Sequence, residues 1–179
     1  LTLASSLKKV MPDCLIMLGG PEVSYDGYKI MAQHPYIDFI IFGEGEETFR
    51  EFIGTLEAGG DFSSVEGLIY REDGKIVENG PRALIADLDT IPFPYDEKLT
   101  GLENKIIYYE TSRGCPFNCQ YCLSSTIDGV RFFSLDRVFK EIDFFIDKGV
   151  RQVKLVDRTF NCNPKRAKAI VEHIIDRGG

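Results

Sequence analysis

Short apolar runs that stop at glycines constrain the fold of this 179-residue chain more than any other feature. Cys14–Leu18 ends at Gly19-Gly20-Pro21, and Ile37–Phe42 ends at Gly43-Glu44-Gly45. Helical patterns flank these runs, at Leu3–Val10, Tyr25–Gln33 and Glu46–Leu56. Continuously apolar strands that alternate with helices are typical of parallel sheets with helices on their faces. The first part of the chain is therefore predicted to be the later portion of a doubly wound α/β sheet.

A hairpin and a proline-containing stretch follow this sheet. Two strand-like runs flank Asp73-Gly74, a dipeptide that suits a two-residue turn, which predicts a β-hairpin over residues 67–79. The two prolines within Leu88–Asp96 bar regular structure and favour an extended path. We interpret this stretch as an interdomain linker.

The last part of the chain again alternates strands and helices. A strand over Lys105–Ser112 is expected to lead directly into a cysteine cluster, and a second strand is expected over Val150–Val156. Ser134 is the predicted cap of one helix, and Asn163 with Pro164 begins another. This order predicts the opening of a parallel barrel or sheet. The expected domains are residues 1–62 (sheet), 63–87 (hairpin extension), 88–104 (linker) and 105–179 (second α/β domain).

Three of the five cysteines lie within eight residues, as Cys115-Pro-Phe-Asn-Cys119-Gln-Tyr-Cys122. Thiolates this close can converge on one inorganic core, and three of them leave one iron of a [4Fe–4S] cluster open. The alternative is a non-catalytic zinc module, whose fourth ligand would be Cys14, Cys162, His34 or His173. A disulfide scaffold is disfavoured because the cysteine number is odd.

The Cys-x3-Cys-x-aromatic-Cys spacing directly after a strand resembles the signature of radical S-adenosylmethionine (SAM) enzymes. This resemblance implies a partial (β/α) barrel of the TIM type, in which the open iron binds SAM. Reductive cleavage of SAM then gives a 5′-deoxyadenosyl radical that attacks an unknown substrate. The resemblance also implies a low-potential electron donor of the flavodoxin or ferredoxin type.

Four further residues match positions that contact SAM in that family. Tyr121 lies in the aromatic position before the last cysteine, near the expected adenine, or it shields the cluster. The end of the second strand often binds the methionine amino group, and here it lacks Gly-Gly-Glu. Asp157 is the expected replacement, with Thr159 and Asn161 as further candidates. A solvent-exposed acid at the strand end is the alternative reading of Asp157.

The first sixty residues, placed ahead of a proline linker and the cysteines, resemble the second half of a cobalamin (B12)-binding domain. The resemblance implies that Gly19 and Gly20, and by analogy Gly43 and Gly45, lie against the corrinoid. Ordinary turn chemistry is the alternative for these glycines. The family's Asp-x-His-x-x-Gly segment is absent, and His34 does not fit it. Cobalamin would make methyl transfer or rearrangement the expected reaction. A methylthiotransferase is a further alternative, disfavoured because only Cys14 lies in the front domain.

Charge and chain ends bear on location and partners. Residues 1–114 carry 10 basic against 20 acidic side chains, whereas residues 115–179 carry 11 against 8. A nucleic-acid partner is disfavoured for the first part and left open for the second.

No apolar run is long enough to span a membrane and no signal peptide is evident, so we expect a cytoplasmic protein. The chain begins at Leu1 within a helical pattern, which suggests further sequence upstream. Cys162 is expected on a loop, and His173 in helix packing.

Overall fold

The computed structural model describes residues 1–95, 100–126 and 129–178. The chain divides into two compact units, Leu1–Ile85 and Ala86–Gly179, each of which is described by itself. Among the helices in the described residues, none combines the length and apolar character needed to cross a membrane.

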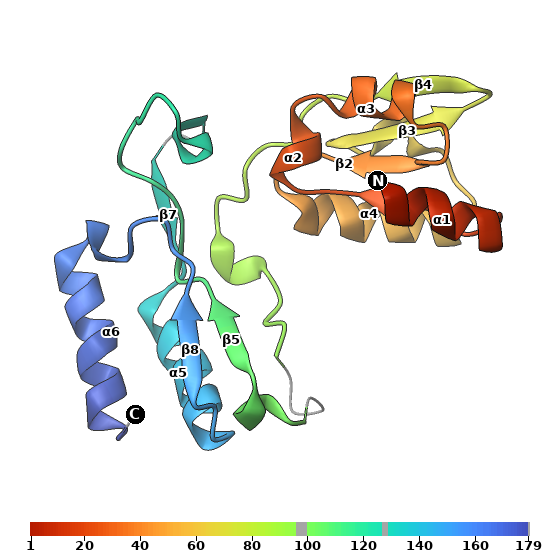
Figure 1. The fold of residues 1–179 in the computed structure, drawn as a ribbon. Coiled ribbons are helices and arrows are strands. Elements are labelled where there is room, and N and C mark those ends of the chain that lie inside the picture. The colour runs from red at the N-terminus through yellow and green to blue at the C-terminus, as the bar shows by residue number, and fades with distance from the viewer. Residues whose placement is uncertain (96–99, 127–128, 179) are drawn as a thin grey trace. The chain divides into compact units, whose positions relative to one another are not determined.

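Unit 1 is a four-stranded sheet with helices on both faces (Figure 1). Its elements in chain order are α1 (Thr2–Val10), β1 (Met17–Leu18), α2 (Pro21–Ser24), α3 (Gly27–Gln33), β2 (Phe39–Ile41), α4 (Gly45–Glu57), η1 (Phe62–Ser64), β3 (Leu68–Glu72) and β4 (Lys75–Glu78). The strand order is β1-β2-β3-β4. Strands β1 and β2 are parallel, and Met17 pairs with Phe39.

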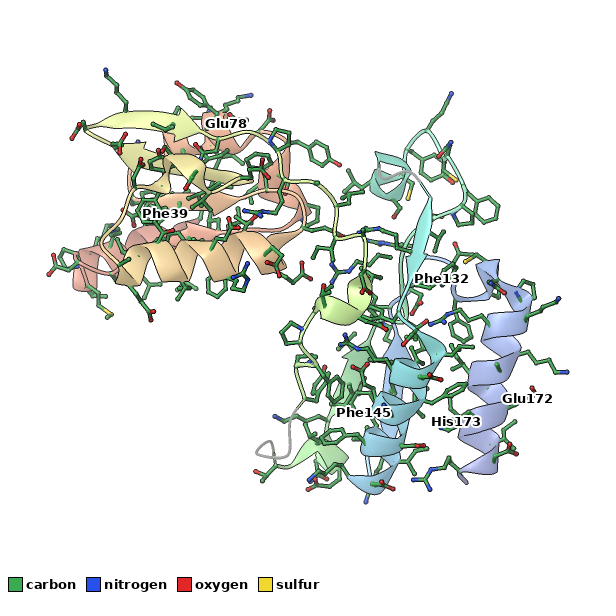
Figure 2. The ribbon with its side chains drawn as sticks, turned by 180° about the vertical axis from the view of Figure 1, so that it is seen from behind. Phe39, Glu78, Phe132, Phe145, Glu172 and His173 are labelled. Atoms are coloured by element: carbon green, nitrogen blue, oxygen red, sulfur yellow. The ribbon has the colours of Figure 1, made fainter. Side chains whose placement is uncertain are left out.

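Alternate residues of β2 supply the two halves of the core. Phe39 packs against Phe52 of α4 with ring centroids 4.7 Å apart, on one face of the sheet (Figure 2). Ile40 points to the opposite face, where Val23 of α2 and Met31 of α3 cover it. Because successive strand residues alternate sides, an entirely apolar strand requires helices on both faces. The predicted α/β fold with parallel strands is confirmed.

The predicted hairpin is present as β3 and β4, joined at Asp73 and Gly74, which both have positive φ. It differs from the predicted extension because β3 pairs antiparallel with β2, with Tyr70 opposite Phe39. The sheet is therefore mixed rather than parallel throughout. The two-residue turn reverses the chain, so the hairpin completes the sheet of unit 1.

Unit 2 contains one parallel and one antiparallel strand pair. Its elements are η2 (Leu88–Thr90), η3 (Leu102–Asn104), β5 (Ile106–Tyr109), β6 (Ser112–Gly114), η4 (Leu123–Thr126), β7 (Val130–Phe132), α5 (Leu135–Asp147), β8 (Gln152–Leu155), η5 (Phe160–Cys162) and α6 (Pro164–Asp176). Strands β5 and β8 are parallel, and the chain between them includes α5. The predicted caps are confirmed, because Ser134 Oγ accepts from the N–H of Arg137 at 3.2 Å and Asn163 Oδ1 from that of Arg166 at 3.1 Å.

The stretch interpreted as a linker packs onto unit 2 over its described part. Leu88 is buried, and the ring of Phe93 lies 5.6 Å from that of Phe145 (Figure 2 labels Phe145). Arg137 of α5 donates to the carbonyl of Asp89 at 2.9 Å. Residues 96–99 of the predicted linker lie outside the described residues. Prolines prevent regular structure here but do not prevent apolar packing.

Candidate functional site

The three clustered cysteines lie on a loop that is closed at its base by two short strands. The predicted strand over Lys105–Ser112 is interrupted: β5 ends at Tyr109, and Ser112–Gly114 forms β6, which pairs antiparallel with β7. Gly114 stands opposite Val130 at the end of this ladder, and Cys115 follows it. The loop therefore leaves from beyond the carboxyl end of β5.

Gly114 is required by the geometry of this base. Its φ is +96°, and a Cβ built on it would lie 2.1 Å from the carbonyl oxygen of Gly129. A side chain at position 114 would therefore clash with backbone rather than with a movable group. The sequence pattern did not single out this glycine, because its partner lies fifteen residues further along the chain.

The three thiols of the motif are free of disulfides. Cys115 and Cys122 are half-buried and Cys119 is exposed, and the N–H of Cys122 donates to the carbonyl of Cys119 at 3.1 Å. Within the described residues, no three Cys, His, Asp or Glu side chains are gathered in an arrangement that could hold a metal ion. The donor set nevertheless fits an iron–sulfur cluster, because cysteine thiolates are the usual ligands of such clusters and all three lie on one short loop.

Of the four residues predicted to contact SAM, Thr159 reaches a motif cysteine from another part of the chain. Its Oγ1 lies 3.4 Å from the Sγ of Cys115, a distance that fits a weak hydrogen bond between hydroxyl and sulfur. Tyr121 is 93% exposed, so its ring is open to a ligand. Asn161 lies in η5, just beyond Thr159. These positions place Thr159 beside the cysteine loop.

Asp157, which follows β8, accepts hydrogen bonds from residues that follow β5, the neighbouring parallel strand. Its carboxylate accepts from the N–H of Thr111 at 3.1 Å, from Thr111 Oγ1 at 2.6 Å and from Ser112 Oγ at 2.5 Å. Thr111 and Ser112 are both buried. Asp157 is only partly exposed. Its hydrogen bonds connect the carboxyl end of β8 to the residues between β5 and the cysteine loop.

Arg166 is a member of this cluster that the sequence analysis did not identify. Its Nη2 donates to the carbonyl of Thr111 at 3.1 Å, and its guanidinium lies 5.2 Å from the ring centroid of Phe132. Burial lowers the pKa of Arg166, and the negative charge of Asp157 opposes that change. An arginine at the third position of a helix gives no sequence signal, because such residues usually point to solvent.

The remaining cysteines and histidines lie in ordinary structural settings. Cys14 is half-buried in unit 1, ahead of β1, and Cys162 is half-buried in η5. His34 caps the C-terminus of α3, and its Nδ1 lies 3.0 Å from the hydroxyl of Tyr36. His173 of α6 stacks on Phe139 and hydrogen-bonds to Asp143 of α5 (Figure 2). The predicted packing role of His173 is confirmed.

The glycines predicted to contact cobalamin lie at one edge of the sheet in unit 1. Gly19 and Gly20 follow β1, while Gly43 and Gly45 follow β2, which runs parallel to β1. Gly20 and Gly43 have φ of +98° and +78°, and a Cβ at either would meet no atom within 4 Å. Open space and bare backbone at the carboxyl edge of a parallel sheet fit close approach of a large ligand. Glu44, between them, instead accepts the N–H of Ile85 at 2.7 Å.

Two family models match these two regions. Residues 1–53 match the B12 binding domain, and residues 109–178 match the Radical SAM superfamily. The chain therefore carries a B12-binding domain followed by a radical SAM region. The radical SAM match includes the cysteine loop, Asp157 and Arg166, and the B12-binding match includes all four glycines.

Relatives of this radical SAM chain include two curated proteins. An uncharacterized methyltransferase of Pyrococcus horikoshii, PH0819, is 36% identical over 99% of this chain and 40% of its own length. The cobalamin-dependent radical SAM methyltransferase TokK of Streptomyces tokunonensis is 33% identical over 90% of this chain and 26% of its own length. The chain thus spans less than half the length of either relative.

One solved structure has the same fold over nearly the whole chain. TsrM of Kitasatospora setae, a radical SAM methyltransferase with cobalamin and a [4Fe–4S] cluster bound, covers 98% of this chain at a TM-score of 0.73. The chain covers 36% of TsrM, and the sequence identity is 17%. The likeness therefore concerns the fold.

Proposed function

We propose that this chain forms the cobalamin-binding and cluster-binding part of a radical SAM methyltransferase. The observation that carries the proposal is a loop with the three cysteines of the C-x3-C-x2-C motif beyond the carboxyl end of β5, in a chain that also has a B12-binding domain. Two of the curated relatives, one of them described as cobalamin-dependent, are named as methyltransferases. The parallel pair β5 and β8, connected through α5, supports an assignment as the first two strands of a partial barrel.

Five of the candidate residues have a defined part in this proposal. Cys115, Cys119 and Cys122 hold the cluster, and the open iron is left for SAM. The hydroxyl of Thr159 lies 3.4 Å from the Cys115 sulfur and would donate to it once that sulfur is a thiolate, and Tyr121 offers an exposed ring for the adenine. When bound, the cluster supplies the electron that cleaves SAM, and cobalamin supplies a carrier for the methyl group. That electron requires a low-potential donor protein of the flavodoxin or ferredoxin type.

The cobalamin would lie at the carboxyl edge of the sheet in unit 1. Gly20 and Gly43 leave backbone bare at that edge, which suits contact with a flat macrocycle. His34 lies at the end of α3 that leads into the amino end of β2, at the opposite edge of the sheet. His173 belongs to α6 in unit 2. Neither of the chain's two histidines is therefore placed on the glycine loops as a cobalt ligand.

The first experiment is anaerobic reconstitution of the chain with iron and sulfide, followed by electron paramagnetic resonance with and without SAM. We expect the signal of a reduced [4Fe–4S] cluster that changes when SAM is added. The C115A variant should lose the cluster, whereas C14A, a matched control outside the motif, should keep it. Uptake of a single zinc ion without iron would contradict the proposal and favour a non-catalytic zinc module.

A further inference from the structure

The carboxylate of Asp157 has most of its hydrogen-bonding capacity committed to protein. An ionised carboxylate offers about four acceptor positions. Three donors occupy Asp157: the N–H and hydroxyl of Thr111, and the hydroxyl of Ser112. All three come from buried residues that, without this carboxylate, would lose these partners. The geometry thus ties Asp157 to the chain between β5 and β6.

This contact joins two strand ends that carry the cysteine site. The N–H of Val156 bonds to the carbonyl of Tyr109 at 2.9 Å, so the parallel pairing of β5 and β8 continues up to Asp157. Ser112 begins β6, and Cys115 follows three residues later. In the segment after β8, Thr159 follows Asp157 by two residues, and its hydroxyl lies 3.4 Å from the Cys115 sulfur. Asp157 therefore fixes both segments that lead to Cys115.

Arg166, in helix α6, also hydrogen-bonds to Thr111. Its Nη2 donates to the carbonyl of Thr111, which also accepts the N–H of Phe133 at 3.1 Å. The Nε of Arg166 is buried and has no hydrogen-bond partner among the described residues. The guanidinium also lies over Phe132 of β7, the strand that closes the cysteine loop. Thr111 is thus held through its N–H, its hydroxyl and its carbonyl.

We propose that Asp157 is a positioning residue, which with Thr111, Ser112 and Arg166 fixes the base of the cysteine loop, rather than a ligand of the SAM amino group. The proposal rests on the proposed function, because its measurements use cluster and SAM binding. It differs from the role that the family resemblance implied for Asp157. A ligand role needs the charge of the carboxylate, whereas a positioning role needs only its hydrogen bonds.

Alanine and asparagine at position 157 separate these two roles. D157A removes every hydrogen bond and should reduce reconstituted iron per chain to about one third or less of the wild-type content. D157N should restore cluster uptake, because its amide keeps the same shape and the Thr111 and Ser112 hydroxyls can turn to accept from it. The SAM affinity of the D157N cluster, measured from the paramagnetic resonance change, should stay within about threefold of wild type.

Two further variants guard against general misfolding. S112A removes one donor and leaves the carboxylate intact, so it should lower iron uptake in the same direction as D157A, but less. D176A, an exposed acid at the end of α6, is the matched control and should leave iron content unchanged. Circular dichroism of each variant reports whether the chain is folded.

A role of Asp157 as a SAM ligand would give a different result in these variants. If D157A and D157N both take up a full cluster, and both bind SAM about tenfold or more weakly, Asp157 is a ligand and the inference is overturned. A wild-type chain that takes up no cluster contradicts the proposed function itself. Normal wild-type uptake combined with normal D157A uptake contradicts only the positioning role.

Discussion

Gly114 shows how a single residue can decide whether the cysteine loop closes. Its positive φ and the nearby carbonyl of Gly129 both exclude a side chain. A strained φ in a non-glycine residue costs of the order of 1–3 kcal/mol, and a backbone clash adds to that cost. A substitution of Gly114 should therefore lower both the stability of the chain and its capacity to bind iron.

We predict that G114A destabilises the chain and prevents cluster uptake. The matched control is G101A, because Gly101 also has positive φ, +74°, but has open space around the position of its Cβ. G101A should show only the backbone cost, about 1 kcal/mol. Thermal unfolding and iron content measure the two effects. Equal behaviour of the two variants would show that the contact with Gly129 is unimportant.

Residue-level contacts were the least predictable part of the site. The cysteine spacing identified the motif because its three members lie within eight residues. The partners of Asp157 lie 45 and 46 residues away, and no sequence pattern relates them. Arg166 and Gly114 were missed for the same reason. Their roles depend on which strand ends meet, and that is set by the tertiary fold.

Elements with strong local signals were predicted more closely. Ser134, Asn163 and Pro164 mark the starts of α5 and α6, because capping acts within one helical turn. Strands β6 and β7 were missed because each has three residues, too few for a periodic pattern. The single strand expected before the cysteines was wrong at its end, because the chain changes pairing partner after β5.

Thr48 connects helix α4 to the chain on both sides of the hairpin, at Glu66 and Arg82. The T48V variant tests this contact. Thr48 is fully buried; its hydroxyl donates to the carbonyl of Glu66 at 2.9 Å and accepts from Arg82 Nε at 2.9 Å. Arg82 also pairs with Glu51. Without the hydroxyl, the carbonyl of Glu66 and the Nε of Arg82 keep only their direct 3.3 Å hydrogen bond, so the substitution should cost about 1 kcal/mol. Denaturant unfolding checks this, and E47A, at an exposed pair on the same helix, should change stability far less.

Helices α5 and α6 are joined by an ion cluster that should make stability depend on acid pH. Burial raises the pKa of Asp143, but hydrogen bonds and charges from His173 and Arg177 lower it by more, so the pKa lies below its ordinary value. A carboxyl group with a lowered folded-state pKa stabilises the fold above its unfolded pKa, near 4, and this stability is lost as pH falls further.

D143N should therefore lower thermal stability near neutral pH and have little effect at the acid end of the range. The expected loss is up to about 1 kcal/mol, because the pair is partly exposed. Thermal melts of wild type and D143N across acid and neutral pH measure the difference. A difference that grows as pH falls would contradict the assigned sign.

At the scale of the whole molecule, the two units carry separate sets of candidate ligand residues. The glycines for cobalamin lie in Leu1–Ile85, and the cysteines lie in Ala86–Gly179. The four-stranded sheet lies in the first unit and the two strand pairs β5-β8 and β6-β7 lie in the second, and the apolar clusters of Phe39 and Ile40 belong entirely to the first unit. The candidate residues for the two cofactors can therefore be substituted separately.

We predict that C115A loses iron uptake while keeping cobalamin binding. The cobalamin spectrum of the C115A protein should match that of wild type, and its affinity should agree within about threefold. Conversely, G20V, which blocks the open edge of the sheet, should weaken cobalamin binding and leave iron content intact. Joint loss of both cofactors in C115A would show that the two units depend on each other for binding.

The ladder between β6 and β7 also bears on how such a site can change during evolution. Because Ser112–Gly114 and Val130–Phe132 pair with each other, the ends of the intervening loop are held about one strand spacing, roughly 5 Å, apart. The entropy of closing a loop rises only slowly with its length. Insertions, deletions or new ligand residues within the loop therefore leave the supporting sheet and helices largely undisturbed. We therefore expect the residues of the cysteine loop to be exchanged more readily in evolution than the strands that hold its ends.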